Sequence, residues 1–334
     1  MATTSVLVGW LPDDSGRDAV GWAGRAAATA REARPGRSVD RAPSEQPRVL
    51  VRCCTVLPRT WPFPTSNAAD ADYRRWVRDR GDESVRAAHD ALTDVLHPDE
   101  LDQPAAFHVD NPAESAGLIG AAATHHTDIV VLGSTDGPPG RFSSGSTSDA
   151  LLHSSRVPLA LVPRGYAERR GPFRRIACAY TGTAESDDAV DTAAVLADRW
   201  NLQLHLVAFA PRRSTTFPPL GGYGAEDLVT AQWSEQATGL LRAAATRVGT
   251  TYPALTPTCA VGVGGGWEDV LRSVDLVDDD VLVLGSSRPG PLARVFLGST
   301  ATKIVRHSPV PVIVVPRGSR LGSARPAHSS KETA

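Results

Sequence analysis

The sequence has few cysteines, and none of them belongs to a metal-binding or redox motif. The four are Cys53, Cys54, Cys178 and Cys259. No pair has the Cys-x-x-Cys spacing, and no His/Cys cluster has the spacing of zinc ligands. All four lie in apolar or strand-like segments, so we predict buried free thiols, as expected for a reducing compartment.

Long hydrophobic runs and an excess of charge are also missing. No apolar run approaches the roughly 18 residues that cross a bilayer, and the N-terminus lacks the pattern of a secretory signal. The formal net charge is −2, and the tryptophans are not interleaved with a basic patch. We therefore expect a cytoplasmic protein that binds neither membrane nor nucleic acid, with its tryptophans as packing residues.

Signatures of catalysis are absent from the sequence as well. It contains no Gly-x-Ser-x-Gly, no Walker Gly-Lys-Ser/Thr and no His-Glu-x-x-His. We therefore do not predict an enzyme, and no catalytic or metal residue is expected; slow ATP hydrolysis stays open. Two polar clusters are interpreted as solvated rather than metal-binding: His125-His126 as a helix end and Asp278-Asp279-Asp280 as a turn.

What the chain does contain is one unusual segment in two copies. Residues 281–300 have the pattern of a buried strand, a Gly/Pro/Ser loop and a helix start, and residues 129–147 repeat that order. Such a loop is a place to bind phosphate, because N–H groups at a helix start lack partners and the helix dipole favours an anion. With 334 residues and 41% hydrophobic content, the two copies indicate a repeated globular domain.

Both halves fit one order of alternating strands and helices. Strands are expected near 6–8, 49–51, 105–109, 128–132 and 157–163, and again near 176–179, 202–209, 257–263, 280–284 and 310–316. Strands that are apolar throughout indicate a parallel sheet covered on both faces. We predict an α/β fold of two similar doubly wound domains, each with a five-stranded parallel sheet, and with ligand sites at the carboxyl ends of the strands.

The expected domains are residues 1–165 and 172–318. A linker is expected near 165–173, and a disordered tail over 319–334 because that segment has no apolar period. The polar stretch 35–47 has loop composition and accounts for most of the extra length of the first half.

These repeated segments resemble a tandem member of the universal stress protein family. Nucleotide-binding members of that family carry Gly-x-x-Gly, nine residues, then Gly-Ser/Thr. The second half has Gly285-Ser-Ser-Arg288, nine residues, then Gly298-Ser299, and the first has Gly133-Ser-Thr-Asp136 with only eight residues before Gly145-Ser146. The closing strands, 155–163 and 307–316, also look like the family's ending. The resemblance covers about 3–165 and 172–318, and implies the universal-stress, adenine-nucleotide α-hydrolase-like fold.

One departure from the family pattern ranks the two halves as nucleotide-binding sites. Relatives carry an Asp after their first strand that contacts the nucleoside; the matching residues here are Leu11 and Thr181. A lost charge-assisted hydrogen bond costs about 1.5–3 kcal/mol, which is on the order of tenfold to hundredfold in affinity. Thr181 can keep a neutral hydrogen bond, whereas Leu11 cannot, and Arg288 can pair with a phosphate. We therefore expect the second domain to be the better site and the first to be degenerate.

The resemblance implies a stress-response or regulatory protein that binds ATP or a related adenine nucleotide, with or without magnesium and without clear catalysis. The alternatives are a protein–protein interaction module of the same fold and an enzyme of the wider α-hydrolase-like group. The expected binding residues are Thr181, Gly182, Thr183, Leu284, Gly285, Ser287, Arg288, Gly298, Ser299 and Thr300 in the second domain, and Gly133, Gly145, Ser146 and Thr147 in the first.

The last strands are expected to join the two halves. In this family they commonly pair across a two-fold dimer. Val157–Val162 and Val310–Val315 are apolar edges that need covering, so we expect them to pair within the chain as a pseudo-dimer. A homodimer of the whole chain stays open.

Overall fold

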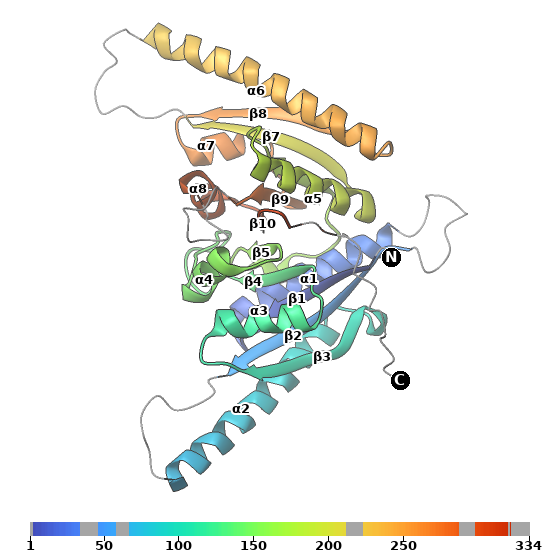
Figure 1. Ribbon diagram of the computed structural model, residues 1–334, viewed down its shortest axis with the longest axis vertical. Coiled ribbons are helices and arrows are strands. Elements are labelled where there is room, and N and C mark those ends of the chain that lie inside the picture. The colour runs from blue at the N-terminus through green and yellow to red at the C-terminus, as the bar shows by residue number, and fades with distance from the viewer. Residues whose placement is uncertain are drawn as a thin grey trace, which may run out of the picture.

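The computed structural model describes residues 3–33, 46–57, 67–211, 223–286, 298–319 and 321. Its strands form one ten-stranded sheet in the order β3-β2-β1-β4-β5-β10-β9-β6-β7-β8. Figure 1 shows the first half of the chain at one end of this sheet and the second half at the other. Each half contributes five neighbouring strands, as the sequence predicted.

The elements of each half alternate as expected. The first half has β1 (Thr3–Gly9), α1 (Asp14–Glu32), β2 (Arg48–Leu57), α2 (Asn67–Thr93), β3 (Leu101–Asp110), α3 (Glu114–Thr124), β4 (Ile129–Gly133), α4 (Ser146–Ser154) and β5 (Leu159–Val162). The second has β6 (Arg175–Ala179), α5 (Ala184–Trp200), β7 (Gln203–Pro211), α6 (Tyr223–Thr251), β8 (Thr258–Gly264), α7 (Trp267–Arg272), β9 (Asp280–Gly285), α8 (Ser299–His307) and β10 (Val312–Val315).

Pairing is parallel within each half and antiparallel at the junction. β1 pairs in parallel with β2 and β4, and β6 does the same with β7 and β9. β5 and β10 run antiparallel, with Ala160 opposite Ile313. The predicted pairing of the last strands is therefore confirmed. Both strands are shorter than expected, since each begins two residues after the predicted Val157 and Val310.

The core lies on both faces of the sheet, which explains why the strands are apolar throughout. Val6 and Val8 belong to the cluster beneath α1, α2, α5 and α6, whereas Leu7 belongs to the cluster beneath α3, α4, α7 and α8. Both clusters run across the junction, since Ile313 joins the first and Val312 the second. The two domains therefore share a continuous core.

The segment between the domains is held by α1 through three side chains. Asp18 accepts hydrogen bonds from the backbone N–H groups of Gly165 (2.8 Å) and Ala167 (2.7 Å). The Thr29 hydroxyl accepts one from the Phe173 N–H (2.7 Å). The third, Arg25, reaches across to the second domain. Burial raises the pKa of Asp18, against the opposing effect of the backbone donors.

The aspartate run 278–280 differs from the predicted solvated turn. Asp280 is fully buried, and both its carboxylate oxygens accept from Arg175, at 3.0 and 2.6 Å. Asp278 and Asp279 pair with Arg169 and Arg25. The predicted solvated position is therefore wrong for Asp280, because Arg175, distant in the sequence, pairs with its buried carboxylate. No cluster of three or more potential metal-ligating residues occurs within the described ranges.

The tryptophans and one helix face also depart in part from expectation. Trp10, Trp22 and Trp200 are buried as predicted, but Trp76 on α2 and Trp233 on α6 are exposed. On α6, the apolar side chain of Leu240 is exposed, whereas Ala237, Leu241, Ala244 and Val248 of the same helix are buried.

Several other predictions are tested only in part by the structure. Cys53, Cys54 and Cys178 are buried free thiols, and Cys259 is a partly buried one. No helix in the described part of the chain is long and apolar enough to cross a membrane. Most of the stretch 35–47 and of the tail 319–334 lies outside the described residues; within the tail, Leu321 is described and is buried.

Candidate functional site

The candidate site of each domain lies where two neighbouring parallel strands end and the following helices begin. In the second domain β6 leads into α5 and β9 leads toward α8; in the first, β1 leads into α1 and β4 into α4. β6 and β9 are paired neighbours, as are β1 and β4. Ligands of doubly wound sheets bind at this carboxyl edge, so the topology brings the predicted loops to the expected place.

In the second domain the turn after β6 is built by local hydrogen bonding. Gly182 has φ of +73°, a left-handed conformation that side chains disfavour. Thr183 caps α5 by accepting a hydrogen bond from the Ser186 N–H at 3.3 Å. Thr181 is exposed, and its hydroxyl lies 3.3 Å from that of Thr183. Two hydroxyls therefore face solvent beside the first turn of α5.

Gly285 packs directly against this turn. A Cβ atom at Gly285 would lie 2.2 Å from the Glu185 carbonyl oxygen, so only glycine allows the end of β9 to approach α5 this closely. The preceding residue, Leu284, is buried in the core and is not exposed at the edge. Gly285 is thus needed for the packing of the end of β9 against the start of α5.

The last predicted segment of the second-domain site is the start of α8. Gly298 is its N-cap, with extended backbone, and Ser299 and Thr300 begin the helix with exposed side chains. Helix-start N–H groups and hydroxyls form a polar end that favours anions. The predicted residues Ser287 and Arg288 lie outside the described residues.

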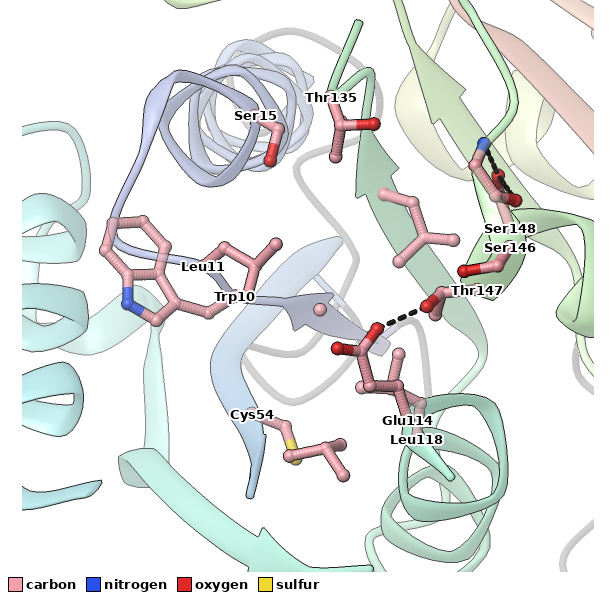
Figure 2. Close-up of a pocket in the computed structure, with 15 residues that line it drawn as sticks. Trp10, Leu11, Ser15, Cys54, Glu114, Leu118, Thr135, Ser146, Thr147 and Ser148 are labelled. Carbon is pink, nitrogen blue, oxygen red and sulfur yellow. Dashed lines mark hydrogen bonds between the residues drawn. The ribbon is translucent and has the colours of Figure 1, made fainter. Parts of the chain in front are cut away.

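The first domain contains a cavity of about 180 Å³ at the equivalent place, which we call the first-domain cavity. All four predicted residues of this domain line it: Gly133, Gly145, Ser146 and Thr147. A Cβ atom at Gly133 would lie 1.9 Å from the Ser15 carbonyl oxygen, which repeats the relation of Gly285 to Glu185. In Figure 2, Trp10 and Leu11 lie on one side of the cavity, and Glu114 and Thr147 on the other.

The loop between β4 and α4 is held by Ser134, which the sequence did not single out. Its hydroxyl accepts from the Ser143 N–H (2.9 Å) and donates to the Asp136 carbonyl (2.7 Å). Gly137 and Gly140 have φ of +95° and +75° within the same loop. One buried hydroxyl thereby ties both sides of the shortened loop together.

Several residues lining the cavity were missed from the sequence: Trp10, Ser15, Cys54, Val56, Glu114, Leu118, Leu132, Thr135 and Ser148. Ligands of doubly wound sheets bind at the carboxyl ends of the strands. That signal could have identified Cys54 and Val56, which lie near the end of β2, and Glu114, which begins α3. Burial raises the pKa of the Cys54 thiol to about 12, so this group is protonated at neutral pH and is a weak nucleophile.

The fold and the two repeated loops define a tandem protein of two doubly wound α/β domains. The sequence model of the universal stress protein family matches residues 39–163 and 172–316. The chain is 36% identical over 263 residues to universal stress proteins of Mycobacterium tuberculosis (Rv2319c) and Mycobacterium bovis (Mb2346c), covering 78% of this chain and 88% of each relative. The chain therefore belongs to the universal stress protein family.

Solved structures show the same fold. A universal stress protein from Archaeoglobus fulgidus aligns with a TM-score of 0.58 and 16% identity, over 94% of this chain and 98% of that one. A putative universal stress protein from Pseudomonas aeruginosa aligns with a TM-score of 0.51 and 14% identity, over 94% and 93% of the two chains. At these identities the similarity defines the architecture alone.

Proposed function

We propose that the second domain binds ATP or a related adenine nucleotide, with or without magnesium, and that the protein acts in regulation or stress response through this ligand rather than as an enzyme. The observation that carries the proposal is Gly285, whose missing side chain brings the end of β9 against the α5 turn. β9 pairs with β6, β6 leads into α5, and β9 leads toward α8.

The phosphates and the nucleoside of a nucleotide each have one candidate binding group in the second domain. Phosphate oxygens fit the start of α8, where Ser299 and Thr300 offer exposed hydroxyls and the helix dipole favours an anion. The nucleoside fits beside Thr181, whose exposed hydroxyl can accept or donate one neutral hydrogen bond. The relatives' shared name supports the proposed stress role, and a cytoplasmic location belongs to the same proposal.

The test is calorimetric titration with ATP, with and without magnesium, of the wild type and two matched variants. Gly298 and Gly145 are the equivalent N-caps of α8 and α4, and both have extended backbone that any residue adopts. Gly298→Trp should fill the second-domain site, and Gly145→Trp the first-domain cavity. Thermal unfolding of each variant confirms that it is folded.

We expect saturable ATP binding that Gly298→Trp abolishes and Gly145→Trp preserves. Loss in Gly145→Trp alone would place the nucleotide in the first domain and overturn the ranking. No heat and no thermal shift at millimolar ATP would overturn nucleotide binding and favour the protein–protein interaction module.

A further inference from the structure

The chain leaves the last strand of each domain in the same way. After β5, the Gly165 N–H donates a hydrogen bond to Asp18 of α1 at 2.8 Å. After β10, the Gly318 N–H donates one to Asp188 of α5, also at 2.8 Å. Both glycines have left-handed backbone, with φ of +80° and +69°, and both aspartates are the fifth residue of their helix. The two departures are therefore equivalent, and the path in the first domain is a guide to the second.

In the first domain the chain continues along α1 and is held there through its backbone. The Phe173 N–H donates to the Thr29 hydroxyl at 2.7 Å. Arg25 donates to the carbonyl oxygens of Gly171 and Pro172, at 2.9 and 3.2 Å. Polar side chains of the helix thus bind main-chain groups of the interdomain segment.

In the second domain the last described residue, Leu321, lies in a cavity. It is 6% exposed, belongs to the core cluster beneath α5 and α6, and lines a cavity of about 640 Å³ between these helices. The other described side chains that line this α5–α6 cavity come from residues 191–199 of α5 and 247–252 at the end of α6. The chain therefore enters the cavity from the Asp188 contact, as the interdomain segment follows α1 from Asp18.

Two polar atoms that line this cavity lack a hydrogen-bond partner. They are the Thr192 hydroxyl and Nη1 of Arg199, and both atoms are buried. Thr192 is 2% exposed as a whole, and Arg199 holds the position in α5 that Thr29 holds in α1. Buried donors without partners cost free energy that a bound acceptor restores. Because both atoms can donate, the cavity suits a chain segment with main-chain carbonyl oxygens.

The charges at the cavity favour the C-terminal segment of this same chain. Asp198 lines the cavity and forms no ion pair with any residue that the structure describes. Residues 322–334 carry one arginine, one lysine and one glutamate. The arginine, Arg325, follows Gly318 by seven residues, as Pro172 follows Gly165. A path like that of the first domain therefore brings Arg325 to the end of α5 that carries Asp198.

We propose that the α5–α6 cavity is a peptide-docking site and that residues 322–334 of the same chain occupy it. Leu321 anchors the segment, Arg325 pairs with Asp198, and main-chain carbonyl oxygens accept hydrogen bonds from Thr192 and Arg199. The cavity starts about two turns beyond the first residue of α5, so the proposal is independent of nucleotide binding at the start of that helix. The second domain then closes its helix face with the end of the chain, as the interdomain segment closes that of the first.

Hydrogen exchange of the full-length protein tests the docking. Mass spectrometry follows the peptic fragment that covers residues 322–334, and a synthetic peptide of the same sequence gives the unprotected rate. The variants are Arg199→Met, Asp198→Arg, and the charge swap that combines Asp198→Arg with Arg325→Asp. Arg242→Met is the matched control, because Arg242 is exposed on α6 and is not among the described residues that line the cavity. Fragments from β1 and β6 report whether each variant is folded.

We expect the segment to exchange at least about tenfold more slowly in the protein than in the free peptide. Arg199→Met and Asp198→Arg should remove most of this protection, the charge swap should restore it, and Arg242→Met should leave it intact, with β1 and β6 unchanged throughout. Exchange at the free-peptide rate in the wild type, or protection that neither single variant lowers, would overturn the proposal. A charge swap that restores nothing would also overturn it. Protection that grows with protein concentration would place the segment in a second copy of the chain instead, against the proposal.

Discussion

Arg25 in α1 of the first domain donates a hydrogen bond to the carboxylate of Asp279 in the second. The arginine side chain is 2% exposed and the aspartate 48%. The same guanidinium donates to the hydroxyl of Tyr166 and to the carbonyl oxygens of Gly171, Pro172 and Asp278. A single buried side chain therefore joins α1, the interdomain segment and the start of β9.

Removing this guanidinium should destabilise the whole protein. Arg25→Ala leaves buried acceptors without a donor, and we expect the free energy of unfolding to fall by about 3 kcal/mol. Urea denaturation followed by circular dichroism measures the change. Arg17→Ala is the control, because Arg17 is 59% exposed and its pair with Asp14 lies in solvent, where an ion pair contributes little to stability. Equal midpoints for the two variants would contradict the prediction.

The β5–β10 junction should be as sensitive as an ordinary domain core. Ile313 is fully buried opposite Ala160, so Ile313→Ala should lower the free energy of unfolding by about 2–5 kcal/mol. Val277→Ala, at a 53% exposed position, should change it by less than about 0.5 kcal/mol. If thermal or urea unfolding of the Ile313 variant resembled that of the control, the junction would be too weak to unite the domains.

Two glycines of the first-domain loop should respond differently to the same substitution. Gly133→Ala places a Cβ 1.9 Å from the Ser15 carbonyl oxygen and should destabilise the protein by about 1–3 kcal/mol. Gly145→Ala meets only the Thr135 hydroxyl, at 3.5 Å, and should be near neutral. Differential scanning calorimetry compares the two, and a Gly133→Ala protein that melts with the wild type would disprove the close approach.

Acid should weaken the second domain through His205. Burial, followed by the nearby Arg175, lowers the pKa of His205 below its ordinary value of 6.5, against the opposing effect of Asp280 and Asp275. As pH falls, the unfolded chain therefore takes up a proton at His205 before the folded chain does. The contribution of this group to the free energy of unfolding is complete above about pH 6.5 and is lost as pH falls below it. Urea midpoints measured from pH 7.5 to 5 should decline in the wild type.

His205→Asn should flatten part of this decline, since the titrating group is gone while a polar atom remains near the Thr258 hydroxyl, 2.7 Å from the histidine Nδ1. His89→Gln on the exposed face of α2 serves as the matched control and should leave the decline intact. A pH profile unchanged by His205→Asn would assign the acid sensitivity to other groups, such as His125, whose pKa is also lowered.

The sequence by itself determined the repeat, the parallel half-sheets and the positions where helices begin at the strand edge. These features are local: Val6, Leu7 and Val8 are apolar in succession because both faces of the sheet are covered, and Thr183 caps α5 from within its own turn. The pairing of the last strands was also predictable, because an apolar edge has to be covered and the chain holds two of them.

Only the tertiary structure decided which charges meet and which apolar faces stay exposed. The partners Glu114 and Thr147 are 33 residues apart in the chain, and Arg175 and Asp280 are 105 apart. Trp76 and Leu240 are exposed on helices that bury other apolar side chains, and the choice between adjacent helix faces depends on how each helix sits on the sheet. Local propensity carries no information about such distant neighbours, so the carboxylate in the first-domain cavity and the arginine joining the domains emerged only from the folded chain.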